Sequence, residues 1–287
     1  MSPIESSKAK AHHRVGPDWP FLVGLSAIGS LYLLLIVAMI IADLSYTSPR
    51  HLLQALGSSE IRYAIKLSLI SCSLSALLSI WVAVPLGYLL ARFSFRGKGL
   101  VDALLDVPIV LPPLVIGLSL LILFQVKLGG RTLDQFCQDI FHLPVTYAIP
   151  SVVLAQFSVA AAFAARTMRV TFEQISPRSE QVAQTLGCSR SQAFWLVAVP
   201  EARRGILTAI TLAWARALGE FGPILIFSGA TRMKTEVLST TVFLELSVGN
   251  LEAAVAVSLL MIATALVVLY IVRLVGSERT MREAVKP

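Results

Sequence analysis

Long apolar runs constrain this chain more than any other feature. The first, from Phe21 to Ala42, contains no charged residue and is about as long as the 20 residues that an α-helix needs to cross the hydrocarbon core of a bilayer. Only 14% of the residues are charged and 56% are hydrophobic, whereas a soluble domain carries about 25% charged residues. The chain is therefore expected to be an all-α integral membrane protein. Its six predicted spans are Phe21–Ala42, Ile61–Ala91, Leu100–Phe124, Ala148–Ala165, Gly205–Gly229 and Leu251–Val272.

The basic residues orient these six spans. Sixteen of the 24 lysines and arginines lie in the two tails, the turn at 92–99 and the segment 166–204, whereas the three other loops hold six. Cytoplasmic loops are enriched in lysine and arginine, so both termini are predicted to be cytoplasmic, in the plasma or inner membrane. This topology explains the net charge of +7 better than nucleic-acid binding does, and no nucleic-acid partner is expected.

The same reasoning divides the chain into four parts. They are a cytoplasmic N-terminal tail (1–20), the first transmembrane helix and its outer loop (21–60), the core of the remaining spans (61–275) and a cytoplasmic C-terminal tail (276–287). Within the core, the polar outer loop from Lys127 to Tyr147 is expected to hold one short helix.

One polar, helix-patterned stretch interrupts the apolar sequence from Glu180 to Pro200, and it is termed the polar hairpin. Its first helix is predicted to end at Gly187, because glycine suits the left-handed conformation that often follows a helix. Ser189-Arg190-Ser191-Gln192 has the pattern of a capping box that begins a second helix, and Pro200 is predicted to end that helix. From spacing alone, the hairpin is either a plain connector between the fourth and fifth spans or a lever on the membrane surface.

Two spans carry residues that disturb a regular helix. The third contains three prolines, which would kink it and free backbone carbonyls that only protein or water can satisfy. The fifth carries Arg216 and Glu220, four residues apart on one helix face; the pair is either a structural ion pair or a direct contact to a transported substrate. We therefore predict the gate of a membrane path at Pro108, Pro112, Pro113, Arg216, Gly219, Glu220, Phe221 and Gly222.

The chain lacks the common signatures of metal and nucleotide binding. Its three cysteines and four histidines share no metal-ligand spacing, so neither a metal site nor a disulfide framework is expected. No G-x-x-x-x-G-K-[ST] sequence occurs, so any ATP-driven action requires a separate ATPase. Five serines between residues 68 and 79 could line an ion path, but close helix packing is the favoured interpretation.

The polar hairpin resembles the EAA motif of ABC importer permeases. Glu180, Ala183 and Gly187 stand at signature positions of that motif, with Gln181 in place of its usual second alanine. The stretch from Pro85 to Phe124 and the later ARALGEFGPILIFSGAT resemble the molybdate, tungstate and sulfate branch of the family. The resemblance covers about residues 60–275 and implies a six-transmembrane-helix type I permease bundle with cytoplasmic coupling helices. It further implies that five residues couple the permease to an ATP-binding subunit: Glu180, Ala183, Gly187, Phe194 and Pro200.

The resemblance also implies a transport function rather than an enzyme. The chain would be the permease subunit of an ATP-driven importer that works by alternating access and carries an oxyanion, first molybdate or tungstate, with sulfate or thiosulfate as the alternative. Its implied partners are a dimer of ATP-binding subunits, which would bind ATP and Mg²⁺, and a periplasmic or lipid-anchored substrate-binding protein. A second permease subunit is also implied, first another copy of this chain and second a paralogue.

Two rivals come from other classes of protein. A passive channel would not need the polar hairpin. An intramembrane enzyme would need paired aspartates, a serine nucleophile motif or zinc ligands within the spans, and the sequence contains none of these.

Overall fold

The computed structural model describes residues 19–284, so most of the N-terminal tail and the last three residues lie outside the described part. These residues form two compact units, one up to Tyr46 and one from Thr47 onward. The first unit is the single helix α1 (Trp19–Tyr46), which carries no charged residue before Asp43. A helix of this length and composition can cross a membrane, which confirms the first predicted span.

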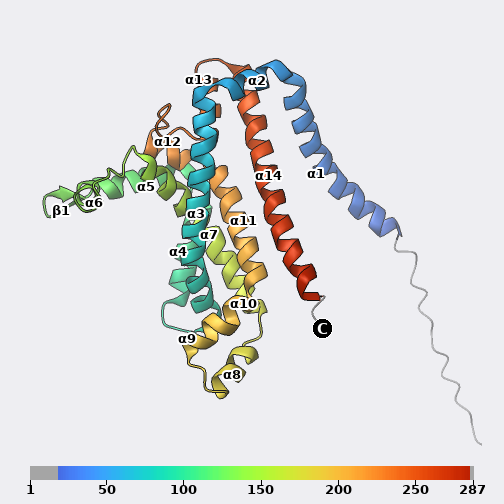
Figure 1. The fold of residues 1–287 in the computed structure, drawn as a ribbon, viewed down its shortest axis with the longest axis vertical. Coiled ribbons are helices and arrows are strands. Elements are labelled where there is room, and N and C mark those ends of the chain that lie inside the picture. Colours follow the sequence, from blue (N-terminus) through green and yellow to red (C-terminus); the bar gives the residue numbers. More distant parts are fainter. Residues whose placement is uncertain (1–18, 285–287) are drawn as a thin grey trace, which may run out of the picture. The chain divides into compact units, whose positions relative to one another are not determined.

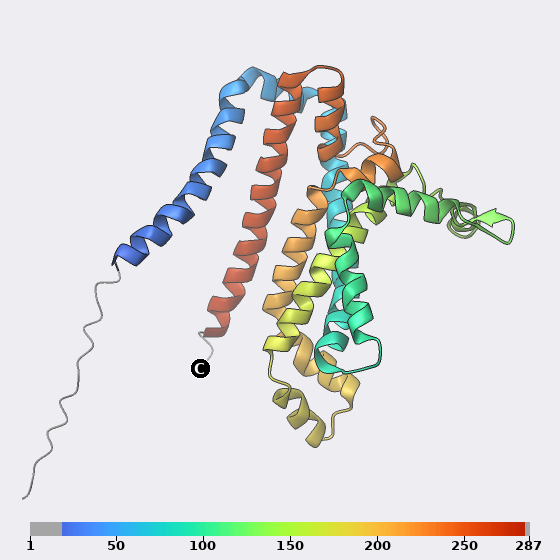
Figure 2. The same ribbon diagram turned by 180° about the vertical axis from the view of Figure 1, so that it is seen from behind.

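Four long helices run side by side in the second unit (Figure 1, Figure 2). They are α3 (Ser59–Arg92), α7 (Ile149–Gln174), α11 (Arg203–Leu218) and α14 (Leu251–Ala284). By length and composition, α1, α3, α7 and α14 can each cross a membrane, whereas α11 can do so only as part of a bent helix pair. Residues 19–284 hold up to six spans if each of two such pairs counts as one.

The serine-rich face of α3 packs against α7. The hydroxyl of Ser75 lies 2.9 Å from the carbonyl oxygen of Val153 and 3.2 Å from Oε1 of Gln156. Small buried side chains allow two helices to approach closely, and this confirms helix packing as the role of the buried serines. These are Ser68, Ser71, Ser75 and Ser79.

The third predicted span is two helices, α4 (Lys98–Val110) and α5 (Pro113–Gln125), which meet at 113°. The prediction of one kinked helix was wrong. A residue that precedes proline is pushed out of the helical region, and both Leu111 and Pro112 are extended, with ψ of 141° and 134°. The fifth span is likewise divided, into α11 and α12 (Gly222–Ser228), which meet at 62°.

Helix α7 is longer than the fourth predicted span and continues from Ala165 to Gln174. Two arginines that charge counting assigned to the cytoplasmic loop therefore lie within the helix. Arg166 is 3.1 Å from Asp106 of α4, and Arg169 forms an ion pair with Asp102 of the same helix. The helix therefore continues beyond the predicted end of the fourth span at Ala165, and these two ion pairs join its last turns to α4.

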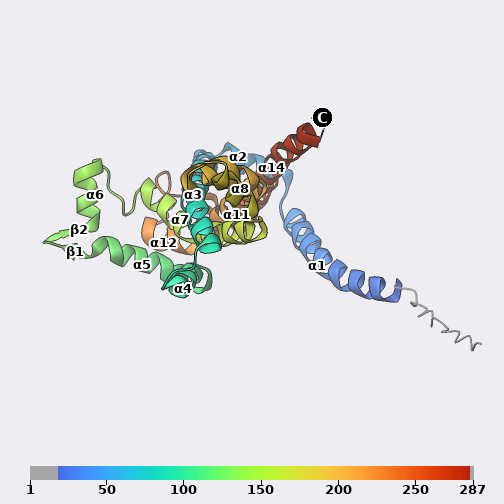
Figure 3. The ribbon, with the colours of Figure 1, turned by 90° about the horizontal axis from the view of Figure 1, so that it is seen from below.

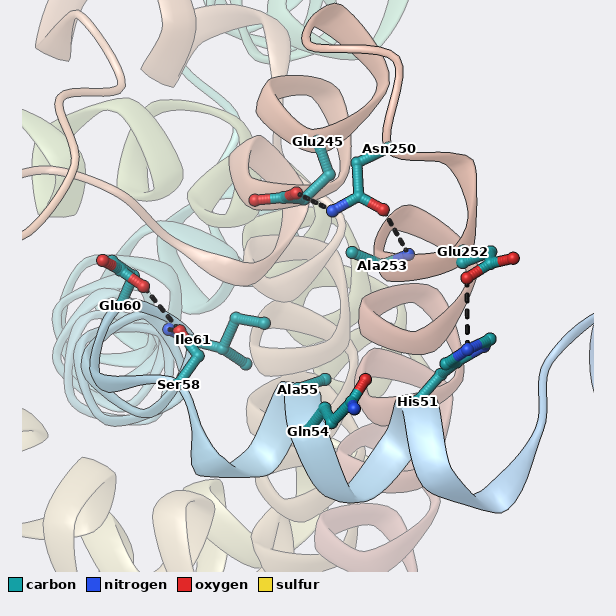
Figure 4. A pocket seen from close by; sticks show the side chains of 10 residues that line it. All are labelled: His51, Gln54, Ala55, Ser58, Glu60, Ile61, Glu245, Asn250, Glu252 and Ala253. Atoms are coloured by element: carbon teal, nitrogen blue, oxygen red, sulfur yellow. Dashed lines mark hydrogen bonds and ion pairs between the residues drawn. The ribbon is translucent and has the colours of Figure 1, made fainter.

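Short helices form the two ends of the second unit. Helices α2 (Pro49–Gly57) and α13 (Leu238–Ser247) lie at one end, and α8 (Arg178–Thr185) and α9 (Arg190–Ala193) lie at the other (Figure 1). At the α2 end, Nε2 of His51 is 3.1 Å from the carboxylate of Glu252, and the side-chain amide of Asn250 donates to Glu245 (Figure 4). These contacts tie α2 and α13 to α14 around a pocket of about 320 Å³.

A lateral arm leaves the bundle after α5 (Figure 3). Strands β1 (Lys127–Leu128) and β2 (Arg131–Thr132) form an antiparallel hairpin, and α6 (Leu133–Phe141) follows. The turn between the strands is Gly129-Gly130, with φ of 62° and 88°, which suits glycine at both positions. Helix α6 confirms the short helix expected in this loop, whereas the β-hairpin was not predicted.

Candidate functional site

The polar hairpin lies at the end of the second unit that is opposite α2 and α13 (Figure 1). Its first helix, α8, ends as predicted, because Gly187 has a φ of 98°, a region that is costly for other residues. The amide of Gly187 donates to the carbonyl of Gln184 at 3.1 Å, and the amide of Cys188 donates to that of Ala183 at 3.0 Å. These two bonds form a Schellman motif, so Ala183 serves the turn through its backbone.

The second helix of the hairpin begins with the predicted capping box. The hydroxyl of Ser189 accepts from the amide of Gln192 at 3.2 Å, and the side chain of Gln192 accepts from the amide of Ser189 at 2.8 Å. Beyond α9 the helix widens into a π-helical turn, η1 (Phe194–Ala198), and continues as α10 (Val199–Glu201). Pro200 therefore lies within the helix, one residue before its end at Glu201, so the predicted end was one residue early. We attribute this to the π-helical turn, whose wider spacing accommodates a residue that has no amide hydrogen.

Glu180 points from α8 into the bundle, and its side chain is only 5% exposed. Nε of Arg92 donates to Oε1 of Glu180 at 2.9 Å, and the hydroxyl of Tyr88 donates to Oε2 at 2.6 Å. Arg92 also donates to the carbonyls of Phe172 at 2.7 Å and Ile175 at 2.9 Å. Tyr88, Arg92, Glu180 and these two carbonyls are termed the Glu180 junction.

Sequence reasoning missed Arg92 and Tyr88 as parts of this site. Arg92 is 88 residues away from Glu180 in the chain, and no local pattern joins them. The only available signal was a basic turn at the end of the second span, opposite an acidic residue of the hairpin.

Two apolar side chains are exposed on the first helix of the hairpin, among polar ones. Val182 is 57% exposed and Leu186 is 81% exposed, beside the exposed turn at Gly187. Phe194 instead faces the bundle, with its ring centroid 4.6 Å from that of Tyr88. Of the predicted coupling residues, the structure thus places Gly187 on the surface and Glu180 and Phe194 inside.

The two predicted gate segments are brought together by the structure. A β-carbon at Gly222 would lie 2.9 Å from the backbone nitrogen of Leu114, and one at Gly117 would lie 2.7 Å from Cα of Pro223. Helices α5 and α12 therefore touch through their backbones. The helix breaks at Pro112-Pro113 and at Gly219 to Phe221 adjoin this contact, whereas Pro108 lies inside α4.

Arg216 and Glu220 form an ion pair at the second of these breaks. Glu220 is 1% exposed, and the side chain of Arg216 is 29% exposed. The guanidinium of Arg216 also lies over the ring of Phe163 on α7, 5.7 Å from its centroid. The second carboxylate oxygen of Glu220, Oε1, is buried and has no hydrogen-bond partner among the described residues, so the ion pair is the main compensation for this buried charge.

Residues 83–280 match the family described as the binding-protein-dependent transport system inner membrane component. The chain belongs to this family of type I ABC permeases. The permease is 31% identical to the sulfate transport system permease protein CysT of Salmonella typhimurium, over 91% of its own length and 94% of that protein.

Two further relatives carry other names. The probable molybdenum ABC transporter permease protein of Haloferax volcanii is 33% identical, and the match covers 86% of each chain. The molybdate/tungstate transport system permease protein WtpB of Pyrococcus abyssi is 34% identical, over 70% of this permease and 75% of that protein.

A solved structure shows the same fold. The crystal structure of a bacterial alginate ABC transporter in complex with an alginate-bound periplasmic protein contains a chain that superimposes with a TM-score of 0.69 at 18% identity, covering 89% of the permease and 93% of that chain. Together with the family match, this confirms the predicted all-α permease fold.

The family match also covers the polar hairpin and both helix breaks, so these elements belong to the permease core. The family is a family of transport components rather than enzymes, which confirms the prediction of a multi-pass membrane transport protein. Within residues 19–284, no group of three or more His, Cys, Asp or Glu side chains could hold a metal ion.

Proposed function

We propose that the permease imports a tetrahedral oxyanion. The observation that carries this proposal is the naming of its relatives, which are sulfate permeases on one side and molybdenum or molybdate/tungstate permeases on the other. Molybdate or tungstate is the first candidate substrate, because the Haloferax and Pyrococcus relatives that carry those names are 33% and 34% identical to this permease. Sulfate is the second candidate, because the Salmonella relative matches over 91% of the chain at nearly the same identity.

Transport would be driven by a separate pair of ATPase subunits that bind ATP and Mg²⁺, since this chain has no P-loop. The exposed apolar side chains of Val182 and Leu186, beside the turn at Gly187, would fit a groove on each ATPase. The buried Glu180 would set the orientation of the hairpin. When ATP closes the ATPase pair, the hairpins would move with it and open the path outward.

Two copies of the permease would enclose this path, because six spans form only part of its wall. A substrate-binding protein would dock at the end of the unit that carries α2 and α13. This arrangement places the polar hairpin and both termini in the cytoplasm. The excess of lysine and arginine in the predicted inner segments supports that orientation, as does the position of the hairpin at the opposite end from α2.

Reconstitution tests the proposal directly. The permease, its ATPase and its binding protein are placed in liposomes. Uptake of labelled molybdate, tungstate and sulfate is measured in turn with ATP inside or outside, each anion in competition with the other two. We expect uptake that requires both ATP and the binding protein, and the strongest competitor identifies the substrate. Uptake of none of the three anions would refute oxyanion import. Flux that persists without ATP would support a passive channel instead.

A further inference from the structure

Arg92 joins three elements of the permease through one guanidinium group. It is the last residue of α3, and it donates to two carbonyls at the end of α7, those of Phe172 and Ile175. The last carbonyls of a helix have no partner within that helix, so Arg92 supplies what α7 lacks. Its third nitrogen, Nε, donates to Glu180 of α8. Only 11% of the Arg92 side chain is exposed, so these bonds are largely shielded from water.

Tyr88, one turn earlier on α3, contacts both arms of the polar hairpin. Its hydroxyl donates to Glu180 of α8 at 2.6 Å, and its ring lies 4.6 Å from the ring of Phe194 in η1. The same ring is 5.4 Å from that of Phe172 of α7. Because one rigid side chain makes all these contacts, neither arm of the hairpin can shift against α3 without breaking one of them.

Helix α3 carries this attachment to the opposite end of the unit. Its 34 residues span about 50 Å at 1.5 Å per residue. Toward its far end, the hydroxyl of Ser68 accepts from the amide of Leu238, the first residue of α13, at 2.8 Å. The next residue, Ser239, donates to the backbone carbonyl of Glu220 at 2.7 Å. A continuous set of contacts therefore runs from the hairpin to the break between α11 and α12.

We propose that Arg92 and Tyr88 are positioning residues for transport, which fix the polar hairpin to α3 so that movement of the hairpin also moves α3 and the break at Glu220. This inference rests on the coupling role proposed above for the hairpin. Separating Glu180 from Arg92 would leave each of these poorly exposed charges without an opposite charge, which is costly. The hairpin and α3 therefore move as one body.

Substitutions at the junction test this in the reconstituted transporter. Tyr88→Phe keeps the ring and removes only the hydroxyl, Arg92→Gln removes the charge, and Arg92→Lys keeps the charge but loses the planar set of donors. The matched control is Arg96→Gln, at an exposed arginine of the same basic turn. The readouts are the amount of permease assembled with its ATPase and the anion imported per ATP hydrolysed.

We expect normal assembly and a loss of import per ATP of at least about tenfold in Tyr88→Phe, since this change removes a hydrogen bond to a charged group. Arg92→Gln should lose more, Arg92→Lys should recover part of the loss, and Arg96→Gln should match the wild type. Unchanged import per ATP in Tyr88→Phe overturns the proposal. So does import that falls only in proportion to the assembled complex, which is what a purely structural role would give.

A second measurement needs no substrate. Spin labels at Gln184 and Leu77, both exposed, report the distance between hairpin and α3 in a permease whose three cysteines are replaced by serine. In the parent permease assembled with its ATPase, we expect one narrow distribution of distances between the two labels, both with and without nucleotide. In Tyr88→Phe and Arg92→Gln we expect a broad distribution. A distribution that stays narrow in both variants overturns the proposal. If the parent imports no oxyanion, the proposed function fails, while the label distances still decide whether the junction fixes the hairpin.

Discussion

Substitutions of Gly187 distinguish two roles of this residue, its backbone conformation in the polar hairpin and its contact with a partner. A left-handed residue other than glycine costs about 1–2 kcal/mol, and the φ of 98° at Gly187 brings this cost to any side chain. Apart from its two neighbours in the chain, no heavy atom of the described residues lies within 4 Å of a β-carbon at this position. Gly187→Ala and Gly187→Trp should therefore lower the stability of the isolated permease by the same amount.

Binding to the ATPase should distinguish the two variants. If the turn seats in a groove of the ATPase, a large side chain overfills that groove, and overpacking costs about 1–3 kcal/mol, which weakens binding by roughly 5- to 150-fold. We expect Gly187→Trp to lose ATPase association and uptake, and Gly187→Ala to lose much less.

The assay compares melting temperatures of the detergent-solubilised variants with their affinity for immobilised ATPase. Equal affinity of the two variants, at equal melting temperatures, would refute the placement of Gly187 at the interface. A melting temperature that is lower for Gly187→Trp than for Gly187→Ala would contradict the open space observed around the turn.

Three further changes test other parts of the structure. Arg216→Ala leaves Glu220, which is 1% exposed, without its ion pair, at a cost of up to about 3–5 kcal/mol. We expect less folded permease or leaky vesicles. Arg204→Ala, at an exposed arginine of the same helix, is the control and should have no effect. Gly117→Ala places a β-carbon 2.7 Å from Cα of Pro223, and such overpacking costs about 1–3 kcal/mol, so the melting temperature should fall. Gly99→Ala is the control, because a β-carbon there meets nothing within 4 Å. Equal melting temperatures of the two variants would contradict the close contact of α5 and α12. Burial raises the pKa of the Glu236 carboxyl, in the segment before α13, above 4.5, so the folded protein holds this proton more firmly than the unfolded chain, and stability should fall as the pH rises from 4.5 through the raised pKa. Glu236→Gln should remove this part of the pH dependence and raise the melting temperature at neutral pH; a pH profile like that of the wild type would show that Glu236 is not the group responsible.

Local signals in the sequence found the polar hairpin accurately. Gly187 and the capping box at Ser189 act within a few residues of chain, so their chemistry is legible without a fold. Pro200 was predicted to end the second helix, which continues one residue further to Glu201 after a π-helical turn that sequence spacing did not predict. The glutamate and glycine of the hairpin were predicted as one coupling group, but they point in different directions, one into the bundle and one outward.

Charge patterns did not reveal where a helix ends. Arg166 and Arg169 were predicted to lie in a loop, yet they lie in α7, where they form ion pairs with Asp106 and Asp102 of α4. The proline pattern of the third span correctly marked a disturbed helix. That pattern did not predict the bend of 113° between α4 and α5. The direction of α5 depends on its contact with α12, where Gly117 approaches Pro223 and Gly222 approaches Leu114.

The sequence by itself determined the number and order of the apolar segments, the charge asymmetry and the hairpin, because these depend on composition and on contacts between near neighbours in the chain. Only the tertiary structure decided the partners of Glu180, since Arg92 and Tyr88 are 88 and 92 residues away. It also decided which bent segments touch. Both outcomes depend on how helices distant in sequence pack, where buried charges must find partners and where only glycine permits two backbones to meet.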